Sequence, residues 1–185
     1  DDDALVDADY IRIYAEHFSA HPDTMAAGGP IEPLYETEEP LWMSPYTKAL
    51  LTAWMNYGTQ VREYPNGRYP GGGNAAYRKE VFERVGLFNT ELGRKGNLLL
   101  ASEEKDIFDK MKALGMKVLY LPTPVLHHCI PQAKLEEDYF NRLTLQIGRS
   151  ERMRTRAISK GKYLKRILSE GVKWGGTLAL LCIYT

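Results

Sequence analysis

The sequence has little that would indicate a disulfide-rich or nucleic-acid-binding protein. Its 185 residues include two cysteines, Cys129 and Cys182, which stand far apart and form no metal-binding spacing. So few cysteines are typical of a reducing compartment. The formal net charge is zero, so composition gives no argument for binding nucleic acid. We therefore expect a cytoplasmic protein with no nucleic-acid partner.

A long apolar run is also missing, and this bears on the C-terminal tail. The most apolar stretch, 174–184, is shorter than the roughly 20 residues that a membrane-spanning helix needs. Before it, Tyr163, Leu164, Ile167 and Leu168 are interspersed with basic residues. That pattern is typical of helices lying on an anionic membrane surface, and a helix packed on the domain is the alternative. Contact through the tail would place the protein at the inner face of the cell membrane.

Charge is distributed unevenly along the chain. The first forty residues hold eleven acidic side chains and one basic residue, Arg12. Between Arg142 and Lys173 there are ten lysines and arginines against two acids, Glu151 and Glu170. The first region could attract cations, and the second could attract phosphates or an anionic membrane. Both could equally be ordinary solvated surfaces.

Hydrophobic periodicity predicts strands alternating with helices, which indicates an α/β protein. A short apolar run before Gly28-Gly29-Pro30 and another ending before Pro122 are typical of strands. A glycine at position 86 and another at 115 are placed to end helices. We expect helices over 7–18, 50–55, 79–85 and 103–114, strands over 25–27 and 116–121, loops over 32–45 and 64–73, and a helical segment from 135 to about 169.

Four groups of residues could carry chemistry. Clustered carboxylates at Asp1-Asp2-Asp3 suit a hard cation such as Mg²⁺ or Mn²⁺, although an acidic segment is more often solvated. Gly71-Gly72-Gly73-Asn74 could bring backbone amides close to an anion, or form a plain turn. Glu103-Glu104 could supply a general base, or simply favour a helix dipole. His127-His128 could complete a metal site, or be satisfied within the fold.

The order of these groups resembles the second half of family 2 glycosyltransferases over about 1–153. The most specific part runs from Gly73-Asn74-Ala75-Ala76-Tyr77-Arg78 through Val85-Gly86-Leu87-Phe88 to Glu103-Glu104-Lys105-Asp106. The resemblance implies the C-terminal half of a GT-A fold, with a mixed sheet flanked by helices and a helical extension. Segment 1–153 would be its catalytic half, 154–185 a basic helical tail, and the nucleotide-binding βαβ half would precede residue 1.

By this resemblance, Asp1-Asp2-Asp3 corresponds to the family's Asp-x-Asp motif. Asp1 would lie near the donor ribose, Asp3, with Asp1, would ligate Mn²⁺ or Mg²⁺, and Asp2 could share either role. His128, favoured over His127, resembles the family's metal-side histidine. The resemblance also implies that Arg142, Gly73 and Asn74 lie near the donor. Asn74 could instead organise the loop to which it belongs.

Glu103-Glu104 takes the place of the family's Glu-Asp pair, whose second member is the general base. Glu104 is one methylene longer than the usual Asp, so it can act as the general base only if the backbone compensates for the extra length. The resemblance implies inverting transfer of a sugar from a UDP- or GDP-sugar to a glycan or lipid-linked acceptor, as in polysaccharide biosynthesis. It also implies that the fragment is inactive without the first half of the fold. A nucleotidyltransferase and a catalytically degenerate scaffold remain alternatives.

Overall fold

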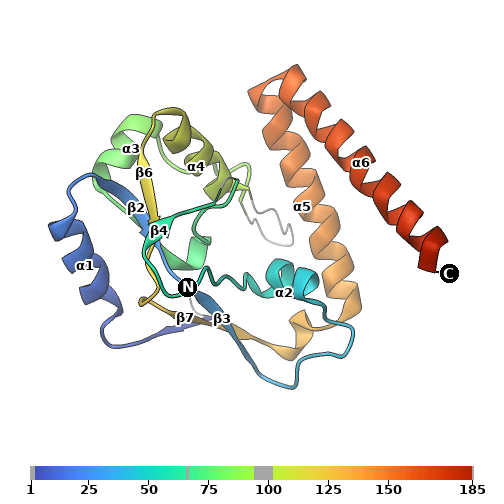
Figure 1. Cartoon of the computed structure of the whole chain (residues 1–185), viewed down its shortest axis with the longest axis horizontal. Coiled ribbons are helices and arrows are strands. Elements are labelled where there is room, and N and C mark those ends of the chain that lie inside the picture. The colour runs from blue at the N-terminus through green and yellow to red at the C-terminus, as the bar shows by residue number, and fades with distance from the viewer. Residues whose placement is uncertain (1–2, 66, 94–101, 185) are drawn as a thin grey trace.

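The computed structural model describes residues 3–65, 67–93 and 102–184, and shows a mixed α/β fold flanked by helices (Figure 1). Two mixed sheets are formed. In the described chain the elements are β1 (Ala4–Val6), α1 (Tyr10–Ala20), β2 (Thr24–Gly28), β3 (Ile31–Tyr35), α2 (Pro45–Thr52), β4 (Arg62–Glu63), the 3₁₀ turn η1 (Gly72–Asn74), β5 (Ala75–Tyr77), α3 (Lys79–Val85), α4 (Glu103–Ala113), β6 (Lys117–Tyr120), β7 (Leu126–Ile130), the 3₁₀ turn η2 (Gln132–Lys134), α5 (Glu137–Ile158) and α6 (Lys160–Tyr184).

The larger sheet has the strand order β4-β6-β2-β5, and the smaller has the order β1-β7-β3. In the larger sheet, β2 runs parallel to β6 and antiparallel to β5. In the smaller sheet, β7 lies between antiparallel β1 and parallel β3. Mixed sheets with flanking helices and a helical C-terminal region confirm the predicted fold class and are consistent with part of a GT-A fold.

The main core lies between the larger sheet and helices α3 and α4. The periodicity of α4 places Ile107, Phe108 and Met111 on its buried face, as the sequence predicts. These side chains pack against Ala26 of β2 and Val81 of α3. Gly115 follows α4 with a positive φ of 64°, a conformation that glycine adopts without a Cβ penalty.

The predicted loop over 32–45 is partly wrong, because Ile31–Tyr35 form β3. Pro33 made a strand improbable from sequence, since proline cannot donate to a ladder. In the structure β3 is an edge strand whose one hydrogen-bonded neighbour in the sheet is β7. An edge strand tolerates proline because one row of its N–H groups needs no partner strand.

Helix α2 begins earlier than the predicted 50–55. Ser44 and Thr47 cap it reciprocally: the Ser44 hydroxyl accepts from Thr47 N–H at 3.2 Å, and the Thr47 hydroxyl accepts from Ser44 N–H at 2.8 Å. Pro45 then supplies the helical φ at the first position. This capping box is worth about 1 kcal/mol and fixes the end of the helix remote from the site.

A buried ionic cluster joins α4, α5 and α6. Arg154, 3% exposed, donates two hydrogen bonds to Glu151 at 2.9 and 3.0 Å and also pairs with Asp109 of α4. Lys105 of α4 reaches Glu151 at 2.9 Å, and Arg166 of α6 lies 3.7 Å from it. The cluster therefore fixes the first turn of α4, which carries Glu103 and Glu104, against α5.

Candidate active site

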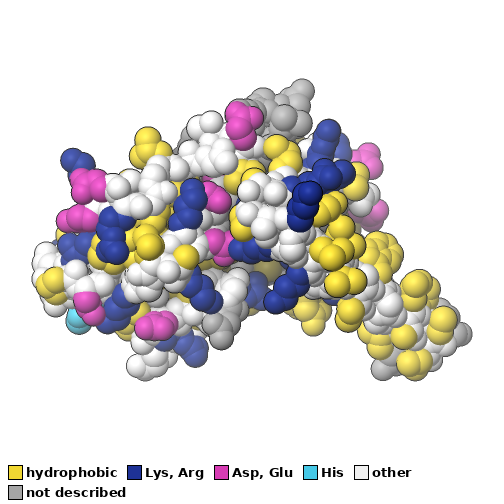
Figure 2. Space-filling model, turned by 90° about the horizontal axis from the view of Figure 1, so that it is seen from above, with side chains coloured by type: hydrophobic (Ala, Val, Ile, Leu, Met, Phe, Trp, Pro, Cys, Tyr) yellow, Lys and Arg dark blue, Asp and Glu magenta, His cyan; other side chains and the backbone are white. Residues whose placement is uncertain are grey.

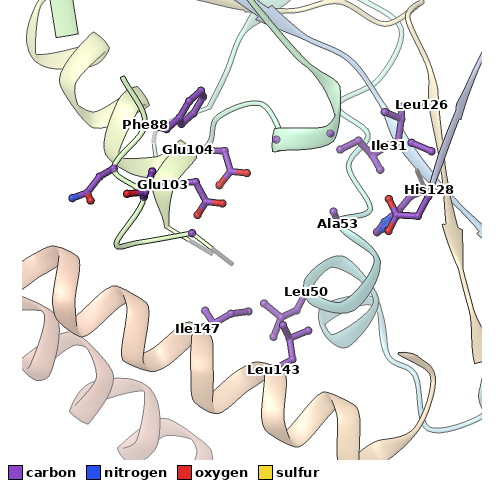
Figure 3. Close-up of a pocket in the computed structure, with 17 residues that line it drawn as sticks. Ile31, Leu50, Ala53, Phe88, Glu103, Glu104, Leu126, His128, Leu143 and Ile147 are labelled. Atoms are coloured by element: carbon purple, nitrogen blue, oxygen red, sulfur yellow. The ribbon is translucent and has the colours of Figure 1, made fainter. Parts of the chain in front are cut away.

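A cavity of about 700 Å³ is lined by residues that are far apart in sequence, from Asp3 to Ile147 (Figure 3). Carboxylates at the start of α4 lie on one side, and His128 lies across the cavity from them. Apolar side chains from α2 and α5 form a third side. The lining residues are Asp3, Ala4, Ile31, Leu50, Ala53, Gly72, Gly73, Phe88, Asn89, Thr90, Gly93, Glu103, Glu104, Leu126, His128, Leu143 and Ile147.

Asp3 and His128 meet at the histidine side of the cavity because β1 pairs with β7. Ala4 is in register with His128, and the backbone N–H of Cys129 donates to the carbonyl of Asp3 at 2.7 Å. Oδ2 of Asp3 thereby lies 3.3 Å from Nε2 of His128. The pairing places a carboxylate and an imidazole, 125 residues apart in sequence, at one point.

The orientation of His128 is fixed by α2. Its Nδ1 lies 2.7 Å from the carbonyl oxygen of Thr52, the last residue of that helix. A carbonyl at a helix C-terminus has no intrahelical partner and can only accept, so Nδ1 carries the hydrogen. In the neutral ring Nε2 then presents its lone pair towards Asp3. A ring nitrogen held by a backbone carbonyl is the usual support of a metal-ligating histidine.

The donor pair fits a divalent cation, with one competing feature. A carboxylate oxygen and an imidazole nitrogen are ligands that Mn²⁺ accepts. However, Lys134 donates to the same Oδ2 of Asp3 at 2.9 Å. This hydrogen bond lowers the pKa of Asp3 below its ordinary value, and partial burial opposes the effect. A bound cation would have to share Oδ2 with the ammonium group or displace it.

The structure leaves part of the predicted metal site undescribed. Asp1 and Asp2 lie outside the described residues. Within 3–65, 67–93 and 102–184, no group of three or more His, Cys, Asp or Glu side chains is arranged to hold a metal ion. The described part of the predicted metal site is therefore limited to two candidate ligands, Asp3 and His128.

Glu103 and Glu104 both line the cavity from the first turn of α4, but their surroundings differ. The Glu103 carboxylate accepts a hydrogen bond from the backbone N–H of Ser102 at 2.9 Å, next to the helix start. The Glu104 carboxylate lies against the backbone of Gly72: a Cβ at that position would be 2.0 Å from its Oε1. Gly72 thus gives room for a side chain one methylene longer than aspartate.

The third side of the cavity is apolar. Leu50 of α2 and Leu143 and Ile147 of α5 face the space between Glu104 and His128 (Figure 3). Leu143 and Ile147 are four residues apart, so they lie on one face of α5. Leu50 is 41% exposed. Polar groups on two sides and hydrocarbon on the third suit an amphiphilic ligand better than a purely polar one.

Asn74 lies in the core beneath the glycine run and is absent from the cavity lining. Its Oδ1 accepts from the hydroxyls of Tyr10 and Tyr14 at 2.7 and 2.6 Å. Its Nδ2 donates to the carbonyls of Pro30 and Pro124 at 2.7 and 2.8 Å. The side chain is fully buried, so contact between Asn74 and a donor has no geometric support here, whereas Gly73 does line the cavity.

The remaining predicted residues lie further away. Arg142 is exposed on α5 and is not among the cavity-lining side chains, so its proximity to donor phosphates stays a prediction. His127 precedes His128 on β7, where successive side chains point to opposite faces, and it does not line the cavity. His128 is therefore the histidine that faces the cavity, and its functional role stays a prediction.

Sequence reasoning missed Lys134 and the apolar side formed by Leu50, Leu143 and Ile147. Lys134 reaches Asp3 because the η2 turn after Pro131 bends the chain back, and no local pattern indicates that contact. The two α5 residues had a weak signal, since their spacing of four is that of one helix face.

Comparison with known proteins agrees with a glycosyltransferase-like architecture. No protein-family model matches the chain. Over 155 residues, 83% of this chain, it is 25% identical to a glucosyl-dolichyl phosphate glucuronosyltransferase of Haloferax volcanii. The matched region covers 49% of that relative, so the chain spans about half of its length.

Proposed function

We propose that this chain carries the catalytic half of an inverting glycosyltransferase of the GT-A type, which moves a sugar from a nucleoside-diphosphate donor to a lipid-linked acceptor. The observation that carries the proposal is one cavity with the Glu104 carboxylate on one side and the Asp3–His128 pair opposite. The similarity to a dolichyl-phosphate-linked glucuronosyltransferase supports both the transfer chemistry and the lipid-linked acceptor.

The chemistry follows from the two sides of the cavity. Asp3 and His128 would hold Mn²⁺ or Mg²⁺, which neutralises charge on a departing diphosphate when bound. Glu104 would accept the proton of the acceptor hydroxyl as that oxygen bonds to the anomeric carbon. The bond from the anomeric carbon to the diphosphate oxygen breaks on the opposite face, and the electron pair leaves with the nucleoside diphosphate. One displacement inverts the configuration at that carbon.

The apolar side supports the choice of acceptor. A sugar is recognised by hydrogen-bonding groups, and three aliphatic side chains offer none. Leu50, Leu143 and Ile147 would instead contact the hydrocarbon nearest the phosphate of a lipid-linked acceptor. Full burial of an exposed aliphatic side chain is worth about 1.5–3 kcal/mol, and Leu50, 41% exposed, could gain part of this by contact with the acceptor's hydrocarbon, whereas Leu143 is already buried.

The test is release of nucleoside diphosphate from a panel of UDP- and GDP-sugars by the full-length protein, with Mn²⁺ or with EDTA. We expect metal-dependent release from one donor, and loss of release in Glu104→Gln with donor binding retained. Transfer of a nucleotidyl group with release of inorganic pyrophosphate would instead identify a nucleotidyltransferase. Donor binding without any turnover, even with lipid-linked acceptors present, would identify a scaffold.

A further inference from the structure

Helix α6 meets the rest of the protein through its polar side. Tyr163, Arg166 and Glu170, spaced three and four residues apart, are the half-buried positions of its first half. The guanidinium of Arg156 on α5 lies 5.0 Å from the centre of the Tyr163 ring, a cation–π contact. With the Arg166–Glu151 pair, these contacts dock α6 on α5 through charge and an aromatic ring rather than through an apolar seam.

The apolar side chains of α6 point away from the protein. Leu164, Leu168, Val172 and Leu178 are each more than half exposed, from 56% to 77%, and their spacing places them on the side of the helix opposite Arg166. A surface helix of a globular domain places its apolar stripe towards the core and its charges towards water. Figure 2 shows the result as yellow side chains along the arm that projects at the right, the C-terminal end of α6. The polarity of α6 is thus reversed, and its outer face requires an apolar partner.

Basic residues accompany the apolar face. Lys160, Lys162, Lys165, Arg166 and Lys173 lie along α6, and figure 2 shows dark blue side chains near the base of the same arm. The acid within this stretch, Glu170, is paired at 2.9 Å with both Arg166 and Lys173. The helix therefore presents a positive field beside exposed hydrocarbon. In the described part of the chain, no helix has the length and apolar character to cross a membrane.

We propose that the outer face of α6 is a peripheral membrane-binding surface that lies in the interface of an anionic lipid bilayer. Leu168, Val172 and Leu178 enter the acyl boundary, and the lysines extend towards the headgroups because their long stems let the ammonium groups reach them. Since α6 packs on α5 through its polar side, the bilayer would lie on the side of α6 that faces away from α5. Membrane binding by this surface does not depend on the sugar transfer proposed above, and it is measured without donor or acceptor.

The test is co-flotation of the protein with vesicles, either phosphatidylcholine alone or with 30% phosphatidylglycerol, at low and high salt. We expect binding to the phosphatidylglycerol vesicles that weakens at high salt. Lys160→Gln with Lys165→Gln should weaken it about fivefold for each charge removed. Val172→Glu with Leu178→Glu should weaken it by at least about 100-fold, since two apolar side chains no longer enter the bilayer.

A matched control carries the same two charges elsewhere. Ile11→Glu with Leu41→Glu replaces exposed apolar residues outside α6 and should leave vesicle binding unchanged. Equal loss of binding in that control, or no binding of the wild type to anionic vesicles, would overturn the proposal. So would a stable dimer that Val172→Glu with Leu178→Glu dissociates, since the partner would then be a second copy. Circular dichroism verifies that each variant is folded.

Discussion

Gly72 and Glu104 offer a substitution that moves one carboxylate while leaving the fold in place. A Cβ at position 72 would lie 2.0 Å from Oε1 of Glu104, whereas ordinary contact begins at 3.4 Å. In Gly72→Ala the carboxylate must therefore shift by about 1.4 Å. Gly72 is not among the glycines with positive φ, so alanine fits its backbone, and the displaced group is the end of a flexible side chain.

The expected consequence is a loss of turnover with little loss of stability. A misplacement of about 1 Å at a reacting group can lower a rate about 100-fold. We therefore expect kcat of Gly72→Ala to fall about 100-fold. The Kd for nucleoside diphosphate should stay within about twofold of wild type, because the role proposed for Glu104 is to accept a proton and not to bind the donor. The assay is steady-state sugar transfer by the full-length protein, with the nucleotide Kd measured by calorimetry.

A second variant separates this reasoning from a general disturbance of the glycine run. Glu104→Asp shortens the side chain by one methylene, which relieves the 2.0 Å contact between the methyl group of Gly72→Ala and Oε1 and leaves the milder 3.1 Å contact at Cγ. The double variant should therefore lose less activity than the two single variants predict together, a coupling that a double-mutant cycle measures. Unchanged turnover in Gly72→Ala, or strictly additive losses, would refute the role of Gly72 as the residue that makes room for Glu104.

Three further predictions follow from the contacts of single side chains. Asn74→Ala leaves buried hydroxyls and carbonyls without partners and should lower the free energy of unfolding by about 3–5 kcal/mol in urea, whereas exposed Asn141→Ala should change it by less than about 0.5 kcal/mol. His128→Gln should weaken Mn²⁺-dependent nucleotide binding at least about tenfold by calorimetry, and His127→Gln should not; equal effects would argue against a metal at Asp3. Burial raises the pKa of Glu151, but hydrogen bonds from Arg154 and Lys105 outweigh it and lower that pKa from 4.5 to about 2. Because the folded state favours the ionised carboxylate, its contribution of up to about 3 kcal/mol is complete above about pH 4.5 and is lost as pH falls towards 2. Glu151→Gln should flatten the stability profile in that window, and an unchanged slope would contradict the assignment.

The parts of the fold that could be predicted from sequence are those set by local periodicity. The buried face of α4 follows from its spacing of three and four residues, and the glycines after α3 and α4 mark their ends. Strand β3 escaped prediction because its stability comes from pairing with β7, nearly a hundred residues later, and because an edge position tolerates Pro33. Local pattern carries no information about such a partner.

The candidate site, too, could be predicted from the sequence only in part. Motif order indicated Asp3, Glu104 and His128 as candidates, but only the register of β1 on β7 determines that His128, not His127, faces Asp3. The contact between Lys134 and Asp3 joins residues 131 positions apart, and the four bonds of Asn74 span 44 to 64 positions. These contacts depend on how separate elements pack, so no residue pattern predicts them.

The measurement that tests the central proposal most directly is recovery of labelled sugar in the organic phase after incubation of the full-length protein with a nucleotide sugar, Mn²⁺ and a lipid-phosphate-linked acceptor. We expect a labelled lipid product that requires Mn²⁺ and has the anomeric configuration opposite to that of the donor. Glu104→Gln should lose this product while the nucleotide still binds. A product with retained configuration, or normal product formation by Glu104→Gln, would contradict the proposal.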